Sequence, residues 1–206
     1  MTTLYYAPGA CSIGIHVLLE EIGKPFELSK VDLQKGEQYQ PSFVEVNAKS
    51  KVPTLKRDDG SVLTEFPAIA TWLALTNPDK KLLPTDPEGQ ARTLEALDHA
   101  VASIHMQAFS RLFRPSNFSP NEADQDTVKA KGKELAVKGF AVMDKRLAGK
   151  DYVNGDYSIA DAALFYVELW AKRMGVELPA NCAKHFERML ARPAVQRTLK
   201  SEGISL

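Results

Sequence analysis

The first 33 residues change hydrophobic period twice, and this change constrains the fold more than any other feature of the chain. Residues 2–6 are β-branched or aromatic, as in a strand, and a Pro-Gly pair interrupts them. Residues 11–22 then carry apolar side chains at helical spacing, namely Ile15, Leu18, Leu19 and Ile22. A second strand pattern covers residues 25–33. Strand, helix and strand in this order predict a βαβ unit with parallel pairing.

A hairpin and a helix are expected next. Short strand patterns lie on both sides of Gly60, which follows two aspartates, and Asp-Gly between apolar runs is a strong hairpin signal. The helix pattern that begins near Phe66 has Thr64 or Glu65 as its expected cap, and it tolerates Pro67 because that residue falls in the first turn.

The chain is then expected to divide. Three prolines fall within residues 78–87 and mark the best linker in the sequence. Beyond it, the patterns are almost entirely helical, and no strand signal follows Leu63. The predicted fold class is α/β followed by all-α, with a first domain over residues 1–78 and a helical domain over residues 87–206. The expected helices cover residues 90–113, 122–147 and 157–174, with a further pair around Pro193.

Composition excludes several classes of function. The chain has 206 residues, with 26 Lys and Arg against 26 Asp and Glu, so it lacks the basic excess of a nucleic-acid-binding protein. No run approaches the roughly 20 apolar residues of a membrane-spanning helix, and no signal peptide is expected. Two cysteines do not make a disulfide framework. These features predict a soluble, cytoplasmic protein without a nucleic-acid or membrane partner.

Four local motifs, in order and with matching spacing, resemble the glutathione S-transferases over essentially the whole chain. The stretch YAPGACSIGIHVLLEE is most similar to the opening of the bacterial beta class. VNAKSKVPTL resembles the segment that carries the family's cis-proline, LTEFPAIATWLA resembles its glutathione-binding turn, and YSIADAALF resembles its capping motif. The resemblance implies a thioredoxin-like domain with a C-terminal helical bundle, glutathione as co-substrate, no metal, and a homodimer.

Cys11 is the first candidate catalytic residue. It lies where the first helix begins, and the unpaired N–H groups and dipole of a helix N-terminus favour an anion there, so a thiol tends to lose its proton more easily. Ser12 can donate a hydrogen bond to a neighbouring thiolate. The alternative is a buried, inert cysteine. The resemblance implies that Cys11 acts close to the glutathione sulfur, and it gives Tyr5 a secondary catalytic role.

The resemblance also implies a set of glutathione contacts on the first domain. A cis Val52–Pro53 bond would let the backbone of Val52 pair with the cysteinyl part of glutathione, as an added strand does. Glu65 would bind the γ-glutamyl ammonium. Phe66 stands where the family usually has serine, so only its backbone N–H would serve the ligand. Lys35 is a candidate for the glycyl carboxylate. The alternatives are a trans proline, a capping carboxylate and a solvated lysine.

Asp98 and His105 are the candidates in the helical part. They lie seven residues apart, which places them on one face of a regular helix. The resemblance implies that His105 is directed into the active site, while the alternative is a structural histidine. Ser158 and Asp161 match a capping box and are expected to serve folding.

The predicted function is transfer of the glutathione thiolate to hydrophobic electrophiles, as in detoxification. The resemblance places the electrophile pocket in the cleft between the two domains. The alternatives are a glutathione-dependent thiol–disulfide transferase, dehalogenase or isomerase on the same fold, and a non-enzymatic binder of hydrophobic ligands. The sequence does not specify the electrophile.

Overall fold

The structure, a computed structural model, describes residues 1–205 and consists of two compact units. The first, called the sheet unit below, contains residues 1–82 and the segment from Leu190 onward. The second, the helical unit, contains residues 83–189. The boundary after Leu82 lies in the expected proline-rich linker. The C-terminal segment, however, belongs to the sheet unit, whereas the sequence grouped it with the helical domain.

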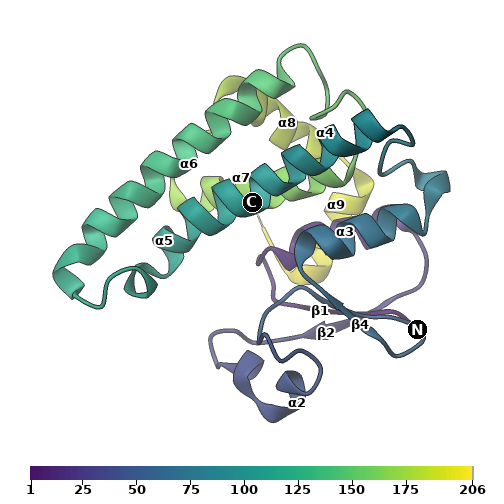
Figure 1. Ribbon diagram of the computed structural model, residues 1–206, viewed down its shortest axis with the longest axis horizontal. Coiled ribbons are helices and arrows are strands. Elements are labelled where there is room, and N and C mark those ends of the chain that lie inside the picture. The colour runs from purple at the N-terminus through teal and green to yellow at the C-terminus, as the bar shows by residue number, and fades with distance from the viewer. Residues whose placement is uncertain (206) are drawn as a thin grey trace. The chain divides into compact units, whose positions relative to one another are not determined.

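A four-stranded sheet forms the centre of the sheet unit (Figure 1). Its strands are β1 (Thr3–Tyr6), β2 (Glu27–Lys30), β3 (Thr54–Lys56) and β4 (Val62–Thr64), and they lie in the order β2-β1-β3-β4. β1 pairs in parallel with β2 and antiparallel with β3, and β3 pairs antiparallel with β4. The predicted βαβ unit and hairpin are confirmed, although β2 is shorter than the expected strand.

Helices cover both faces of this sheet. α1 (Ser12–Ile22) and α3 (Phe66–Leu75) lie on one face, and the short α2 (Pro41–Val44) lies on the other (Figure 1). α1 ends at Gly23, whose φ of 74° is in the left-handed region that favours glycine. Ile13, Ile15, Val17 and Leu18 of α1 are completely buried.

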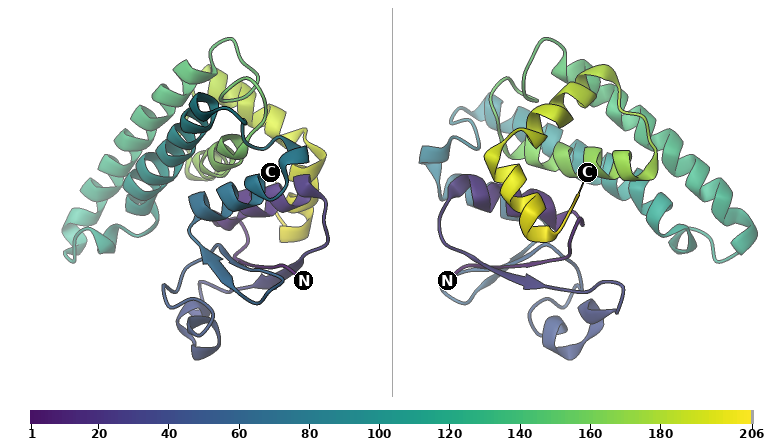
Figure 2. Two further views of the ribbon diagram at one scale, coloured as in Figure 1. Left: turned by 45° about the vertical axis from the view of Figure 1, so that its right-hand side comes forward. Right: turned by 180° about the vertical axis from the view of Figure 1, so that it is seen from behind.

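The last helix explains why the C-terminal segment belongs to the sheet unit. α9 (Pro193–Glu202) runs beside α1, as Figure 2 shows in yellow and purple. Ion pairs join the two segments, because Arg192 Nε lies 2.7 Å from Glu21 Oε1 and Arg197 pairs with Glu20. These contacts connect positions more than 170 residues apart, which no local pattern could predict.

The helical unit is built from long helices that pack side by side (Figure 1). The predicted helix over residues 90–113 begins earlier, at Pro87, because Asp86 accepts a hydrogen bond from the N–H of Gly89.

None of the helices in residues 1–205 combines the length and the apolar character that a bilayer crossing requires. The α-helices of this part are α4 (Pro87–Asp98), α5 (Ser110–Phe113), α6 (Gln125–Leu147), α7 (Ile159–Met174) and α8 (Ala180–Leu190). Short 3₁₀ turns in the chain are η1 (Glu37–Tyr39), η2 (Pro78–Lys80), η4 (Pro115–Asn117) and η5 (Glu122–Asp124).

A π-helical segment, η3 (His99–Phe109), joins α4 to α5. Its wider winding closes hydrogen bonds from residue i to i+5, as between the Ser110 N–H and the His105 carbonyl. The expectation that Asp98 and His105 share a face assumed 3.6 residues per turn, so it does not hold across this segment. π-Helical turns are rare and are often found at functional sites.

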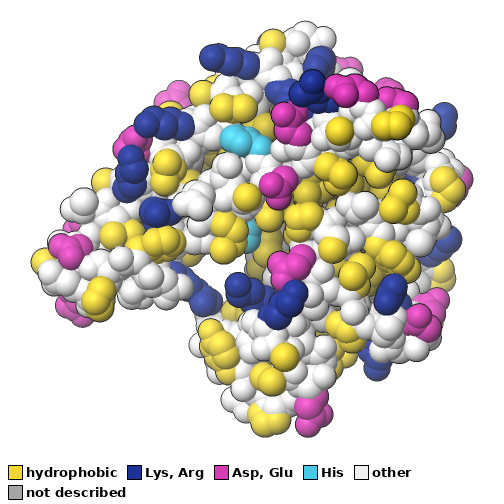
Figure 3. All heavy atoms as spheres, in the orientation of Figure 1, with side chains coloured by type: hydrophobic (Ala, Val, Ile, Leu, Met, Phe, Trp, Pro, Cys, Tyr) yellow, Lys and Arg dark blue, Asp and Glu magenta, His cyan; other side chains and the backbone are white. Residues whose placement is uncertain are grey.

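Charged side chains of both signs are interspersed on the visible surface (Figure 3). Several form i,i+3 or i,i+4 pairs along single helices, such as Arg92 with Glu88 on α4 and Lys138 with Glu134 on α6. This distribution agrees with the zero formal net charge of the chain.

Glycines allow α6 to approach η3 closely. The Nε2 of His99 is 3.1 Å from the carbonyl oxygen of Gly139, and a Cβ added at Gly139 would lie only 2.6 Å from Cγ1 of Ile104. Ile104 is completely buried, so it has little room to move.

We therefore expect Gly139→Ala to destabilise the protein. Alanine normally improves a helix interior by about 1 kcal/mol over glycine, but overpacking against Ile104 costs roughly 1–3 kcal/mol. Urea unfolding should show a lower free energy of unfolding. The exposed Val137→Ala on the same helix is the control and should stay within about 0.5 kcal/mol of the parent. A stabilised Gly139→Ala variant would contradict the close packing.

Buried charges form a second feature of the helical unit. His185 of α8 lies between two carboxylates of α7, with Nδ1 2.8 Å from Glu168 Oε2 and Nε2 3.2 Å from Asp161 Oδ1. All three side chains are completely buried. Burial alone would lower the pKa of His185, but the charges and hydrogen bonds of Glu168 and Asp161 overcome it and raise the pKa to about 10.

This cluster predicts a pH-dependent stability. Because the folded-state pKa of His185 lies above the ordinary value of 6.5, its contribution is complete below pH 6.5 and is lost as the pH rises through about 10. We expect the free energy of unfolding to fall from pH 7 to pH 10 more steeply in the parent than in His185→Gln. Equal slopes in chemical unfolding at the two pH values would show that His185 is not held as a cation.

Candidate functional site

Cys11 lies in the turn between β1 and α1, at the N-cap position of the helix. Its side chain is half-buried, and the thiol donates a hydrogen bond to the carbonyl oxygen of Val52 at 3.4 Å. Val52 precedes Pro53, and the peptide bond between them is cis, as the resemblance implied. The structure thus brings together two predicted site elements that are 41 residues apart.

The thiol of Cys11 is not the easily ionised group that its helix position suggested. Burial raises its pKa to about 12, although the backbone N–H groups of Cys11 and Ser12 lower it. The helix N-terminus acts in the expected direction, but the loss of water outweighs it. Cys11 is therefore a neutral thiol at physiological pH and a hydrogen-bond donor.

Ser12 and Tyr5, the two supporting candidates near Cys11, both make contacts within the sheet unit. Ser12 is completely buried, its hydroxyl donates to the Ala7 carbonyl, and the Ala7 N–H donates back to it, each over 3.2 Å. This exchange fixes the β1–α1 turn, so the hydroxyl is directed at Ala7. The half-buried ring of Tyr5 packs edge-on against Phe43 of α2, with centroids 5.8 Å apart.

A residue that sequence reasoning missed, Asn47, holds the loop before the cis bond. The Nδ2 of this buried residue donates to the Lys51 carbonyl and to Thr54 Oγ1, each at 2.8 Å, and its Oδ1 accepts from the Lys49 N–H. An asparagine in a polar stretch before a Pro is a turn signal, which could have identified it.

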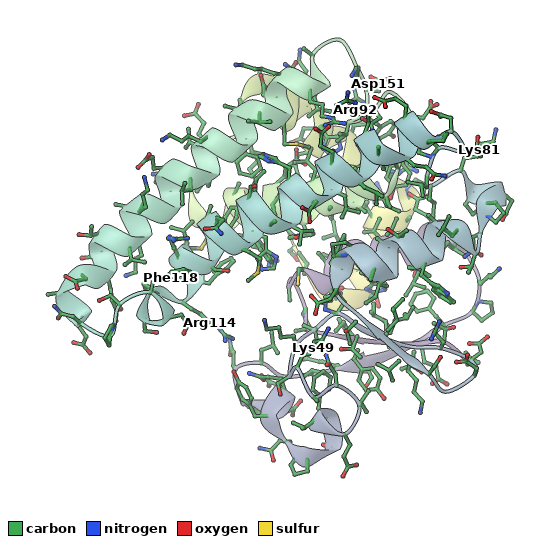
Figure 4. All side chains as sticks on the ribbon, in the orientation of Figure 1. Lys49, Lys81, Arg92, Arg114, Phe118 and Asp151 are labelled. Atoms are coloured by element: carbon green, nitrogen blue, oxygen red, sulfur yellow. The ribbon has the colours of Figure 1, made fainter. Side chains whose placement is uncertain are left out.

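The turn before α3 carries the predicted ammonium-binding residue. Glu65 is exposed and has a φ of 71°, which non-glycine residues seldom adopt. It does not cap α3 through its side chain. Instead its carboxylate lies 2.7 Å from Nζ of Lys49, which also contacts Thr64 Oγ1 at 2.9 Å; Figure 4 labels Lys49. Lys49 is a second residue that the sequence did not reveal.

Phe66 and Lys35 complete the predicted contacts on the sheet unit. The Phe66 side chain is buried in the core, so only its backbone faces the turn at Glu65. Lys35 is highly exposed, and its ammonium lies 3.5 Å from Asp32 Oδ2. A carboxylate beside Lys35 weakens it as a site for a ligand anion.

His105 and Asp98, the two predictions in the helical unit, differ in their surroundings. The half-buried ring of His105 has its Nδ1 3.2 Å from the Tyr166 hydroxyl and packs edge-on against Trp170, with centroids 4.7 Å apart. Asp98, at the end of α4, is exposed. The structure therefore surrounds His105 with specific side-chain contacts and leaves Asp98 on the surface.

A buried carboxylate from the last helix holds the turn before Cys11. Glu202 of α9 accepts a hydrogen bond from the Gly9 N–H at 2.8 Å, and its other oxygen lies 2.9 Å from Nδ1 of His16. The side chains of His16 and Glu202 are completely buried. The sequence placed His16 among the structural histidines, and its partner is 186 residues away.

The fold and this site define the class of protein: it consists of a thioredoxin-like domain followed by a helical bundle. The family model for the glutathione S-transferase N-terminal domain matches residues 9–76, and that for the C-terminal domain matches residues 101–193. The chain is 37% identical to glutathione S-transferase GstA of Escherichia coli O157:H7, over 98% of each protein.

Solved structures agree with this assignment. A sphingomonad glutathione S-transferase in complex with glutathione is 34% identical over 98% of this chain and 100% of its own, with a TM-score of 0.85. A bacterial beta class enzyme of Sphingomonas chungbukensis is 33% identical with the same coverage and a TM-score of 0.84. The chain belongs to the glutathione S-transferase family. It is an enzyme, and glutathione is its co-substrate.

We expect the loss of Glu202 to weaken the turn before Cys11. Glu202→Ala leaves the Gly9 N–H and His16 without this carboxylate, and breaking such a buried pair costs about 3–5 kcal/mol. Thermal and urea unfolding should show a strongly reduced stability. Glu202→Gln, which keeps the shape and both hydrogen-bonding positions, should lose less, and the exposed Glu187→Gln should be neutral. An Ala variant as stable as the parent would show that this contact contributes nothing.

Proposed function

We propose that this chain is a beta-class glutathione transferase that conjugates the glutathione thiolate to hydrophobic electrophiles. One observation carries the proposal: the Cys11 thiol donates a hydrogen bond to the Val52 carbonyl beside the cis Pro53. This carbonyl is the group expected to pair with the cysteinyl part of glutathione. A ligand bound there would have its sulfur next to the Cys11 thiol. The likeness to a beta class enzyme and to a glutathione complex supports the same assignment.

Acid–base chemistry assigns different protonation states to the sulfur of Cys11 and the sulfur of glutathione. An ordinary thiol has a pKa near 8.5, whereas the pKa of Cys11 is raised to about 12. When two such groups meet, the proton remains on Cys11 and the glutathione sulfur is the thiolate. Cys11 then stabilises this anion as a hydrogen-bond donor, a role that a preorganised group performs without moving.

The remaining contacts are proposed on the same basis. Glu65 binds the γ-glutamyl ammonium, and Lys49, its present partner, has to give up or share the carboxylate. Val52 supplies its backbone, and Lys35 meets the glycyl carboxylate after separating from Asp32. His105 is the contribution of the helical unit to turnover. We further propose a cytoplasmic homodimer, a detoxifying role, and secondary roles for Tyr5 and the Phe66 backbone.

Substitution of Cys11 tests the proposal. A hydrogen bond to a charged group contributes about 1.5–3 kcal/mol, so Cys11→Ala should lower kcat/KM for conjugation by roughly tenfold to a hundredfold. Cys11→Ser keeps a donor and should retain most activity. The buried Cys182→Ala controls for thiol chemistry elsewhere in the chain. Activity is measured with glutathione and a model aryl halide, and glutathione binding by calorimetry.

Two other results would overturn this reading. If the folded parent binds no glutathione by calorimetry, the proposed site is wrong. If Cys11→Ala and Cys11→Ser are equally inactive while both bind glutathione, Cys11 is a nucleophile, and the thiol–disulfide transferase replaces the conjugating enzyme.

A further inference from the structure

Two residues of α7 hold the ring of His105. Tyr166 and Trp170 are four residues apart and therefore adjacent on one face of the helix. Both rings meet His105 edge-on, at centroid separations of 5.7 Å for Tyr166 and 4.7 Å for Trp170, with interplanar angles of 86° and 87°. Tyr166 and Trp170 also pack against each other at 5.0 Å. The imidazole thus lies against a rigid aromatic pair.

The backbone of His105 is fixed as well. Its carbonyl accepts the i+5 hydrogen bond from the Ser110 N–H, and the Ser110 hydroxyl donates to the same oxygen at 3.4 Å. This π-helical turn determines where along α7 the ring of His105 lies. Ring orientation and backbone position are therefore both restrained before any ligand binds.

The hydrogen bond between Tyr166 and His105 determines which ring nitrogen carries the proton. The Tyr166 side chain is completely buried, and its hydroxyl lies 3.2 Å from Nδ1. A phenol is the stronger donor of the two groups, and an imidazole nitrogen is a stronger acceptor than a phenol oxygen. The favoured arrangement is therefore O–H···Nδ1, in which the proton of the neutral ring resides on Nε2.

We propose that Tyr166 is a positioning residue that holds His105 as its Nε2–H tautomer, so that His105 serves the reaction as a hydrogen-bond donor to an anion. This inference rests on the proposed role of His105 in turnover. In this tautomer Nδ1 is occupied by the Tyr166 hydroxyl, and Nε2 has no lone pair to accept a proton. His105 is thereby excluded as a general base and suited to stabilise the negative charge of a bound anion.

Nuclear magnetic resonance of the whole protein tests the tautomer directly. Long-range ¹⁵N–¹H spectra of protein labelled at its four histidines distinguish a protonated ring nitrogen from an unprotonated one, and His105→Gln assigns the signals of His105. We expect protonated Nε2 and hydrogen-bonded, unprotonated Nδ1 in the parent. In Tyr166→Phe we expect a mixture of the two tautomers. A parent with its proton on Nδ1 overturns the proposal, whether or not the variant folds.

Kinetics provide the second measurement. Tyr166→Phe should lower kcat for conjugation about fivefold, the effect of one lost hydrogen bond, with an unchanged KM for glutathione. In the His105→Gln background the same change should have no further effect. Tyr152→Phe, which removes the hydroxyl of a ring that packs edge-on against His185 in the same unit, is the matched control and should leave kcat unchanged.

The outcomes separate this inference from the proposed function. A fully active His105→Gln would remove His105 from the reaction, while the tautomer measurement would still decide whether Tyr166 fixes the ring. An unaltered kcat in Tyr166→Phe, combined with an impaired His105→Gln, would overturn the positioning role alone.

Discussion

Burial of α1 is the constraint on which the rest of the sheet unit depends. The helix is covered by the sheet, by α3 and by α9, so its apolar residues and His16 lose contact with water. His16 is accommodated only because Glu202 supplies a carboxylate, and the same carboxylate fixes Gly9 in the turn that leads to Cys11. Packing of the last helix thereby controls the geometry of a turn near the N-terminus.

Partial burial beside α1 also changes the chemistry of Cys11. A helix N-terminus stabilises a thiolate by a modest amount, since the effect of the dipole is about 0.3–1 kcal/mol at exposed sites. Removal of water acts in the opposite direction and is the larger effect here, so the pKa is raised to about 12. The position of a cysteine in the sequence therefore predicts where its sulfur lies but not whether that sulfur is charged.

The sequence predicted local features of the fold and could not predict the contacts of the site that depend on distant partners. The βαβ unit, the hairpin and the cap formed by Ser158 and Asp161 follow from spacing within short segments. The contact of Glu202 with His16 depends on how α9 packs. The π-helical winding of η3 was missed because apolar spacing over a few turns fits both types of helix.

Cys11 and His105 illustrate how the surroundings of a side chain can make it a hydrogen-bond donor. Cys11 was expected to lose its proton more easily than an ordinary thiol, but burial raises its pKa instead. In our proposal His105 is held in one tautomer by the hydroxyl of Tyr166. Each group becomes a donor of a hydrogen bond. In the proposed reaction the negative charge belongs to glutathione, so a group that donates a hydrogen bond serves better than one that removes a proton. Desolvated donors meet this need better than charged groups, because they stabilise an anion without themselves forming ion pairs with other side chains.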